Sequence, residues 1–531
     1  MAKKIRFLNA GTRSLLVELA GLDETLTLLD VLLAQQPQGV TDIIPAARTV
    51  MVEFDPAIIS RQVLARLISK LDLSSQAVRH GNTFEIPVLY DGEDLEDVAI
   101  LLGCTTAEVI RRHTSATFTV AFTGFAPGFA YMTCDDLSFD IPRRSSPRIK
   151  IPAGSVALAG KFGGIYPSDS PGGWQLIGRT PLQMWDLSRE RPAFLAPGDR
   201  VRFCDLATTT VKPVTFPTPH SAAQASVKNG IRVLRSDRPA LFQDLGRKGC
   251  TNQGVSASGA VDRNSLRSAN LAVGNGEGEG AIEIAFGCFA VKSDRPITVA
   301  VTGAVCPLTI RTAAGQELGA SHGVAIALDE GDELVLGFPK TGSRSYLALR
   351  GGFEVDPVLG SVASDTLAKI GPEPIVAGNI LVPAARPATA VALAADTIEL
   401  PDDKRLVVLE VVLGPRDDWF TADGLQTFLD QEWLVTPASS RVGLRLAGAK
   451  TIERKDHAEL PSEATTLGAI QVPHSGQPVL FAADHPLTGG YPVIAVVAET
   501  HLDLAGQLPI GARIRFQVAN GQEHIVGETD I

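Results

Sequence analysis

The sequence predicts a mainly β protein that begins with a small α+β module. The chain has 531 residues, and its 50 glycines and 34 prolines against 6% aromatic residues are typical of many tight turns between strands. A second observation is a repeat, because residues 198–203 and 511–516 share the strand-like pattern Gly-x-Arg-(Val/Ile)-Arg-Phe. The repeat indicates two related β domains in tandem, each ended by one of these closing strands.

The length and the charge exclude several classes of protein. A chain of 531 residues implies several domains rather than one core. The net charge of −11 argues against a nucleic-acid binder, because such proteins neutralise phosphates with basic surfaces. The six cysteines form no C-x-x-C pair, the basic first residues precede no signal-peptide core, and no apolar run could span a bilayer. We therefore expect a reduced, cytoplasmic protein without a metal site, a membrane contact or a nucleic-acid partner.

Residues 1–80 have the pattern of the α+β module. Alternating apolar residues predict its strands, and leucines three or four positions apart predict the first helix. The predicted order is strands 5–8 and 15–19, helix 23–36, strands 40–44 and 49–54, and helix 58–71. This order would place both helices on one face of an antiparallel sheet.

A β domain is predicted over residues 81–205, followed by a linker over residues 206–228 that is rich in Thr, Pro and Ala. Residues 229–531 restart a β-rich pattern and form the second predicted domain, with a helix over 262–273. The elements predicted in the first domain are strand 83–90, helices 94–101 and 106–114, and strands 117–122 and 198–203.

The stretch from residue 117 to residue 179 is the first candidate for a functional site. It interleaves glycine-rich and proline-rich loops with a basic segment over residues 142–148. Glycine lets the backbone approach a ligand closely, proline stiffens a loop, and arginine presents a fixed positive charge. Such loops suit a carboxylate or a phosphate, although the tight corners of a β domain need the same glycines and prolines.

Several side chains of the first half are candidate site residues. The predicted catalytic residues are His113, Tyr131 and Arg148: an acid or base near neutral pH, a hydroxyl donor and an anion anchor. The alternatives are a structural histidine, a ring that caps the barrel and a solvated arginine. The predicted substrate-binding or anion-binding residues are Arg143, Arg144, Ser155, Tyr166, Gly172, Gly173 and Arg179.

The second half supplies a further set. Asp244 and Arg247 are predicted to form an ion pair beside the site, with a structural surface bridge as the alternative. Asp244 and Asp484 are the predicted catalytic carboxylates, whereas Asp262 is a helix cap or a base. Other predicted anion or substrate contacts are Arg441 and Arg445, which would face one side of a strand, and the turn residues Gly489, Gly490 and Tyr491.

Two literal motif matches fail on their context. The G-x-G-x-x-A match at residues 276–281 follows a helix and precedes a strand, the reverse of the dinucleotide-binding arrangement. The G-x-S-x-G match at residues 319–323 precedes a strand-like run, whereas a nucleophile elbow leads into a helix. Neither match therefore defines a site.

Motifs in both halves resemble one known family. In the first half, residues 124–131, 142–148, 152–155 and 170–180 resemble the KipI-type domain, also called allophanate hydrolase subunit 1. The resemblance implies a cyclophilin-like β-barrel in each half, and it identifies the chain as a fusion of two subunits. The segments of the second half that resemble the KipA-type domain, also called allophanate hydrolase subunit 2, are 243–247, 254–255, 258–262, 270, 274–275, 440–446, 471–473 and 488–492.

The resemblance implies three functions. Members of the family are paired subunits of the bacterial ATP-dependent 5-oxoprolinase, and we expect fused B and C subunits that activate a small lactam or amide. ATP with Mg²⁺ would be the co-substrate, and a protein like the A subunit of 5-oxoprolinase would be the partner in an oligomer. The first alternative is the carboxyltransferase part of a urea carboxylase or urea amidolyase, with carboxybiotin on a partner and a biotin carboxylase. The second alternative is a KipI-like regulator that binds a histidine kinase.

The chain lacks some parts of the larger enzymes and departs from the family pattern in places. It contains no Met-Lys-Met tripeptide for biotin attachment and no Gly/Ser-rich amidase signature, so we do not expect it to hydrolyse allophanate alone. Leu444 stands where a tyrosine is frequent, Ala464 replaces a glycine, and His-Pro-Leu at 485–487 replaces Arg-Gln-Thr. These differences leave the substrate open.

Overall fold

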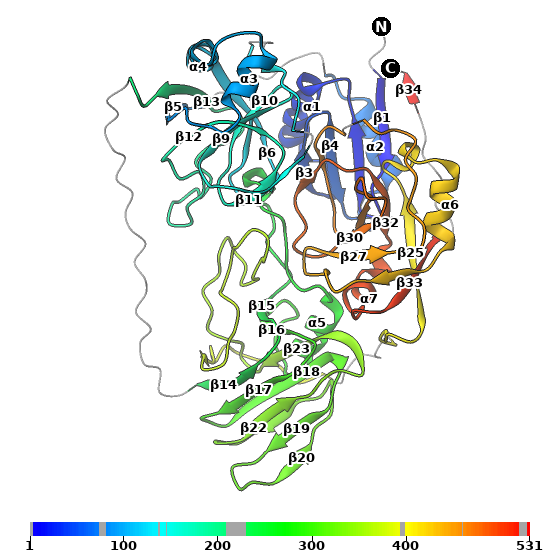
Figure 1. Ribbon diagram of the computed structural model, residues 1–531. Coiled ribbons are helices and arrows are strands. Elements are labelled where there is room, and N and C mark those ends of the chain that lie inside the picture. The colour runs from blue at the N-terminus through cyan, green and yellow to red at the C-terminus, as the bar shows by residue number, and fades with distance from the viewer. Residues whose placement is uncertain are drawn as a thin grey trace.

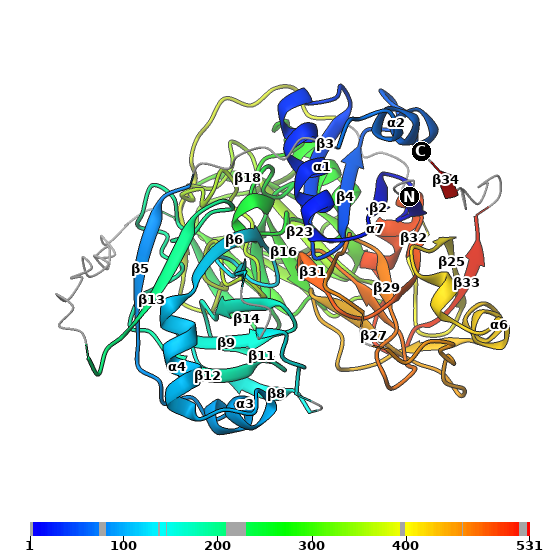
Figure 2. The same ribbon diagram turned by 90° about the horizontal axis from the view of Figure 1, so that it is seen from above.

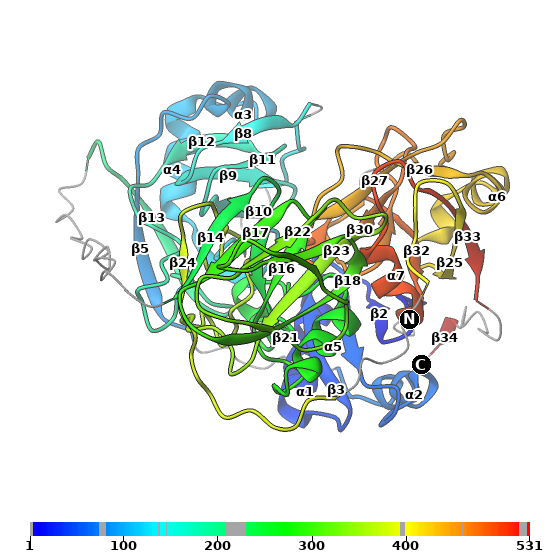
Figure 3. The same cartoon turned by 90° about the horizontal axis from the view of Figure 1, so that it is seen from below.

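The computed structural model describes residues 4–73, 81–135, 139–144, 146–208, 230–392, 399–458, 460–519 and 528–530. They form an N-terminal module, a first barrel, a β-sandwich and a second barrel (Figure 1). Most of the predicted linker, from residue 209 onward, lies outside the described residues. Figures 2 and 3 show the two barrels side by side, with the module adjoining both.

The N-terminal module is an antiparallel sheet in the order β3-β4-β2-β1-β34 with two helices on one face, as predicted. Leu32 of α1 and Leu64 of α2 pack with strand residues such as Val52 in one core. The opposite face of the sheet packs on the second barrel through Leu16 and Met51. The elements are β1 (Lys4–Asn9), β2 (Ser14–Glu18), α1 (Leu22–Gln35), β3 (Val40–Pro45), β4 (Thr49–Phe54), α2 (Arg61–Ser69) and β34 (Glu528–Asp530).

The first barrel has seven strands in the order β12-β9-β10-β7-β6-β13-β5. A bridge between Leu89 and Arg179 brings β5 beside β12 and nearly closes it. The elements are β5 (Thr83–Val88), α3 (Leu95–Leu101), α4 (Thr106–Ser115), β6 (Thr117–Thr123), β7 (Ala130–Thr133), β8 (Arg148–Ile151), β9 (Ser155–Ala159), β10 (Phe162–Ile165), β11 (Ser170–Gly172), β12 (Gln175–Arg179) and β13 (Arg200–Asp205).

The second barrel repeats this topology in the closed order β25-β32-β29-β30-β27-β26-β33. In each barrel the closing strand pairs in parallel with the first strand: β13 with β5, and β33 with β25. The prediction of two related domains ended by a common strand is therefore confirmed. The elements are β25 (Leu406–Leu413), η3 (Asp417–Trp419), α6 (Ala422–Asp430), β26 (Trp433–Val435), β27 (Gly443–Ala447), β28 (Glu463–Ala464), β29 (Ala469–Gln471), β30 (Val479–Phe481), β31 (Thr488–Gly489), β32 (Val493–Val497), η4 (Glu499–His501), α7 (Leu502–Gly506) and β33 (Arg513–Val518).

A β-sandwich lies between the two barrels in the sequence. A six-stranded and a five-stranded sheet share one core, and α5 covers the outer face of the smaller sheet. Residues 229–531 therefore hold two separate cores, one in the sandwich and one in the second barrel. The elements are β14 (Ile231–Ser236), β15 (Ala240–Gln243), η2 (Thr251–Gln253), α5 (Arg263–Ala272), β16 (Ala281–Ala285), β17 (Phe289–Ser293), β18 (Ile297–Val305), β19 (Leu308–Arg311), β20 (Glu317–Gly319), β21 (Ile326–Leu328), β22 (Glu333–Leu336), β23 (Thr341–Leu349) and β24 (Ile380–Leu381).

The glycine-rich loop between β6 and β7 joins the first barrel to the other units. The Phe125 N–H donates to Thr488 Oγ1 of the second barrel at 2.9 Å, and the Gly128 N–H donates to the Gln253 carbonyl of the sandwich at 2.9 Å. A Cβ on Gly124 would lie 2.8 Å from the Thr488 side chain, and one on Gly254 would lie 2.6 Å from a backbone oxygen. These glycines therefore permit close packing of three units.

Candidate functional site

Two cavities lie between the units. The larger, which we call the barrel cleft, has a volume of about 1290 Å³ between the module and the first barrel, with a rim from the second barrel. The smaller, which we call the junction cavity, has a volume of about 780 Å³ and walls from the module, the sandwich and the second barrel. Within the described ranges, no three His, Cys, Asp or Glu side chains gather closely enough to hold a metal ion.

The barrel cleft contains two of the residues predicted from the sequence, Tyr131 and Arg143. The Tyr131 hydroxyl lies 3.4 Å from Ser462 Oγ of the second barrel, and the ring stacks on Phe122. A Cβ added to Gly490 would lie 3.2 Å from Arg143 Nη1. The Arg143 guanidinium therefore lies beside the turn that was predicted to bind substrate. The cleft thus brings together predicted residues from both halves.

The other predicted arginines of the first barrel are engaged in ion pairs. Asp94, only 1% exposed, accepts hydrogen bonds from both Arg144 and Arg148, and the Leu176 N–H donates to it at 2.7 Å. Arg148 also contacts the exposed Glu93 at 3.0 Å. These contacts brace the β7–β8 loop against the start of α3. They leave Arg143 as the loop arginine that lines a cavity.

The remaining candidates of the first barrel lie away from both cavities. His113 is fully buried, stacked on Phe203, with Nδ1 2.8 Å from the Tyr90 hydroxyl, and burial lowers its pKa to about 3. It is therefore a neutral core residue at physiological pH. Tyr166 is also buried, and its hydroxyl packs so closely on Gly172 that a Cβ at that position would clash with it. Ser155 is buried in β9, Gly173 follows β11, and Arg179 forms an exposed ion pair with Asp91 at 2.8 Å.

The predicted ion pair between Asp244 and Arg247 does not form. Asp244 accepts hydrogen bonds from the Gly246 N–H, the Val362 N–H and the Ser361 hydroxyl. Arg247 instead donates to the carbonyls of Val358, Ala363 and Ile370. Both residues therefore brace the same loop of the sandwich through different partners.

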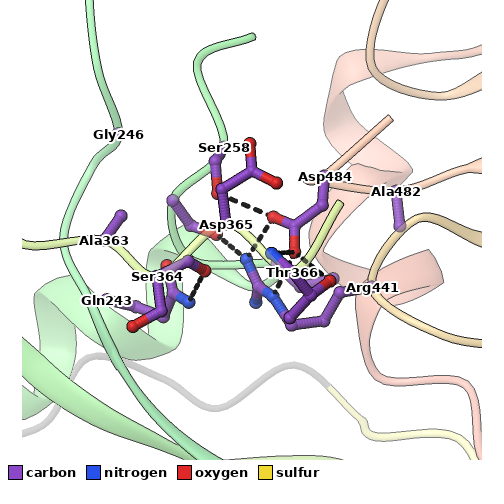
Figure 4. A network of polar contacts seen from close by, with 12 residues as sticks. Gln243, Gly246, Ser258, Ala363, Ser364, Asp365, Thr366, Arg441, Ala482 and Asp484 are labelled. Atoms are coloured by element: carbon purple, nitrogen blue, oxygen red, sulfur yellow. Dashed lines mark hydrogen bonds and ion pairs between the residues drawn. The ribbon is translucent and has the colours of Figure 1, made fainter. Parts of the chain in front are cut away.

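Arg441 and Asp484 lie together in a buried network (Figure 4). We call this network, which also includes Glu283, the buried clamp. Arg441 donates to Asp484 at 2.9 and 3.0 Å and to Glu283 at 2.5 Å. Burial alone would raise the pKa of Asp484, but Arg441 and the hydroxyls of Ser258 and Thr366 hold it below its usual range. The clamp ties the sandwich to the second barrel, and it leaves Asp484 without an exposed oxygen to offer a substrate.

The expectation that Arg441 and Arg445 face one side is wrong. Strand β27 begins only at Gly443, so Arg441 lies in the preceding loop and is buried, whereas Arg445 is exposed on the strand. Asp262 is the N-cap of α5, because the Ser265 N–H donates to its carboxylate at 2.8 Å. Tyr491 packs against Arg454 and His474.

The junction cavity is lined by two carboxyl groups with raised pKa values. Asp42 of β3 and Glu53 of β4 are paired across the strands, and both line the cavity. Burial raises the pKa of Glu53 to about 7, and the neighbouring Asp42 adds to this effect. Burial also raises the pKa of Asp42, although the Thr251 hydroxyl donates to it at 2.7 Å. One wall of the cavity therefore carries two carboxyl groups that cannot both ionise readily.

Cations and a histidine form other walls of the junction cavity. Arg247 is 2% exposed, and its Nη1 has no hydrogen-bond partner. Arg263 at the start of α5 lines the cavity and has a buried Nε without a partner. His485 is kept neutral because burial lowers its pKa, and its Nδ1 lies 2.9 Å from the Ala482 carbonyl. Such a site can bind a small polar molecule between guanidinium donors and carboxyl groups.

Sequence reasoning missed Asp42, Glu53 and Arg263. The available signal was the position of the two carboxylates, each in a strand of otherwise apolar pattern (VTDIIP and TVMVEF). A charged residue on a face shared with core residues such as Met51 is unusual and marks a candidate site.

Comparison with known proteins gives the family. Residues 253–518 match the carboxyltransferase domain, subdomains A and B, and residues 5–195 match the carboxyltransferase domain, subdomains C and D. The chain therefore belongs to the carboxyltransferase domain family and carries both subdomain pairs in one polypeptide.

Two curated relatives and one solved structure are similar to this chain. The C subunit of 5-oxoprolinase from Escherichia coli K12 is 32% identical over 303 residues, 56% of this chain and 94% of that protein. The B subunit of 5-oxoprolinase from Escherichia coli O157:H7 is 38% identical over 169 residues, 31% of this chain and 78% of that protein. The crystal structure of TTHA0988 has a TM-score of 0.81 and 32% identity, and covers 95% of this chain and 99% of that chain.

None of the helices in the described part of the chain is long and apolar enough to cross a membrane.

Proposed function

We propose that this chain combines the roles of the B and C subunits of a 5-oxoprolinase, and that it acts with a partner like the A subunit of that enzyme. The proposal depends on one observation: a single chain is similar to both the B and the C subunits, over 78% and 94% of their lengths. The arrangement of the cavities supports it. The junction cavity takes Asp42 and Glu53 from the region matching subdomains C and D, and Arg263 and His485 from the region matching subdomains A and B. A separate B or C subunit would supply only part of these walls.

The proposed reaction is the ATP-dependent opening of the lactam ring of 5-oxoproline to glutamate. An amide is unreactive, so its oxygen must be activated, and phosphorylation by ATP with Mg²⁺ is one route. The site must then offer cations to the anionic groups and donors to the activated oxygen. Arg247, Arg263 and Lys248 are among the cations that line the junction cavity and could take these roles.

The test is a reconstituted assay. The purified chain is mixed with an A-type subunit of 5-oxoprolinase, 5-oxoproline, ATP and Mg²⁺, and glutamate is measured by chromatography. We expect glutamate only in the complete mixture, and none when either protein or ATP is omitted. No glutamate in the complete mixture would contradict the proposal.

A second candidate is carboxyl transfer, which the names of both matched family models favour. A biotin carboxylase and a biotin carrier would then be the partners, and carboxybiotin on the carrier would be the donor. Amide-dependent consumption of bicarbonate in the presence of those partners, without glutamate formation, would support this candidate over the first.

A further inference from the structure

Asp42 and Glu53 lie directly opposite each other on neighbouring antiparallel strands. The register shifts between Val40 and Asp42, so Thr41 is an extra residue that places Asp42 rather than itself across from Glu53. Such opposed side chains have Cβ atoms roughly 5 Å apart, and like charges in this position are destabilising. The bulge therefore places two carboxyl groups opposite each other at a cost in folding stability. Because folding does not explain this arrangement, a functional role is expected for the pair.

No ion pair among the described residues neutralises this carboxyl pair. The Thr251 hydroxyl and the Ile43 N–H donate to Asp42, and the Thr466 hydroxyl contacts Glu53 at 3.4 Å. The strand alternation that directs Met51 to the second barrel directs Glu53 to the same side, where it lines the junction cavity. The pair therefore faces the cavity without an ion-pair contact to any described cation, and the charges of Arg13 and Arg263 only oppose the rise in the pKa of Glu53.

The charged groups around Glu53 come from every unit that walls the cavity. Arg13, in the β1–β2 turn, is paired with Glu499 at 2.5 Å. Arg263 lies at the start of α5, and its backbone N–H donates to Asp503 at 2.8 Å. His485 of the second barrel is neutral. On the sandwich wall, the buried guanidinium of Arg247 keeps one N–H group without a partner, an independent sign that the cavity is built for a ligand.

We propose that Glu53 is the acid that delivers a proton to the nitrogen of a small amide bound in the junction cavity, and that Asp42 is its positioning partner. This inference rests on the proposed amide hydrolysis. Asp42 accepts two hydrogen bonds, and its charge disfavours a second charge and so keeps the proton on Glu53. The pKa of about 7 for Glu53 agrees with this geometry, because a group with that value gives and regains protons at neutral pH.

Phosphorylation by ATP places the phosphoryl group on the amide oxygen and releases ADP. The oxygen of a water molecule then adds to the amide carbon, and the water loses one proton to solvent. As the carbon–nitrogen bond breaks, its electron pair passes to the nitrogen, which takes the proton from the Glu53 carboxyl. The added OH group becomes a carbonyl by returning its proton to the Glu53 carboxylate, which leaves the carbon as an acyl phosphate. A second water then displaces inorganic phosphate from this carbon and gives the carboxylate of the product.

The experiment compares Glu53→Gln, Asp42→Asn and the control Glu330→Gln in the reconstituted glutamate assay. Glu330 is an exposed carboxylate in the β21–β22 turn, far in sequence from the module, so its change matches the chemistry of Glu53→Gln. We expect Glu53→Gln to lower kcat at least about 100-fold with KM changed less than about threefold, the size typical of a lost general acid. Glu330→Gln should stay within about twofold of the wild type.

The pH profile separates an acid from a structural carboxyl. The wild-type rate should fall as pH rises through about 7, because the acid must be protonated. Asp42→Asn removes the neighbouring charge, so Glu53 should lose its proton at lower pH. The fall of the rate with rising pH should therefore begin at a lower pH than in the wild type. Melting curves check that each variant is folded.

Two results would overturn the inference while the proposed function stands. One is a Glu53→Gln variant whose kcat is within threefold of the wild-type value. The other is a folded Asp42→Asn variant whose rate falls at the same pH as that of the wild type. If the wild-type chain with its partner forms no glutamate, the proposed function fails, and this inference falls with it.

Discussion

Replacing Glu53 by glutamine should make the protein more stable at alkaline pH. Burial raises the pKa of this carboxyl from 4.5 to about 7, so the folded protein holds a proton that the unfolded chain releases between these values. The free energy of unfolding therefore falls as pH rises across this window, because the native state binds more protons than the unfolded state. The contribution of the protonated group is fully present below pH 4.5 and is lost above about pH 7.

The magnitude follows from the shift. At about 1.4 kcal/mol per pKa unit, a rise from 4.5 to about 7 amounts to about 3 kcal/mol. Glutamine resembles the protonated acid and does not titrate. The variant should therefore match the wild type at low pH and exceed it by about 3 kcal/mol at pH 8, a difference of a few degrees in Tm.

The assay is scanning calorimetry of the wild type, Glu53→Gln and Glu330→Gln at pH 5 and pH 8. The comparison between variants removes the effect of other titrating groups such as Asp262, whose pKa burial raises to about 6. The reasoning would be refuted if Glu53→Gln lowered the Tm at pH 8, or if its effect were the same at both pH values. Either result would mean that Glu53 is ionised and paired in the folded protein.

Three further substitutions test the packing of the units by calorimetry or chemical denaturation. Arg441→Met should cost about 3–5 kcal/mol, because Asp484 would stay buried without its cation and Glu283 would keep only Arg344. The exposed Arg445→Ala should change stability by less than about 0.5 kcal/mol. Equal effects would show that the buried clamp adds nothing to stability. Gly254→Ala should destabilise the protein about 1–3 kcal/mol more than Gly103→Ala. Both glycines have positive φ, but only the Cβ added at Gly254 would lie 2.6 Å from a backbone oxygen. Similar losses of stability would refute the close packing at Gly254. Arg148→Ala should cost about 2 kcal/mol of stability, because the buried Asp94 would lose one of its two arginine partners. Arg179→Ala breaks an exposed ion pair and should cost less than about 1 kcal/mol. The reverse order would contradict the structural role of Arg148.

The parts of the fold that were predictable depend on local pattern. The strand and helix order of the module follows from short alternating and helical periods, and the structure confirms it. The closing strands at residues 200–205 and 513–518 were recognisable because both begin with Arg-(Val/Ile)-Arg-Phe and occupy the same position in their barrels. The boundary between the sandwich and the second barrel was not visible, because strands of either unit have the same alternation.

The candidate site was harder to predict because its geometry depends on contacts between distant segments. Arg148 looked like an anion anchor, but its partner Asp94 lies in another loop 54 positions away. The pairing of Asp42 with Glu53 depends on a bulge at Thr41, which shifts the register by one residue. Sequence spacing also suggested that Arg441 and Arg445 share a strand face, and only the start of β27 at Gly443 shows that they do not.

The central claim is that one chain performs the work of two 5-oxoprolinase subunits. The most direct measurement is the ratio of ADP to glutamate formed when this chain and a purified A-type subunit of 5-oxoprolinase are incubated with ATP, Mg²⁺ and 5-oxoproline. We predict one ADP for each glutamate without any separate B-type or C-type protein. Glutamate that appears only after separate B-type or C-type proteins are added, or ADP formation without glutamate, would contradict the claim.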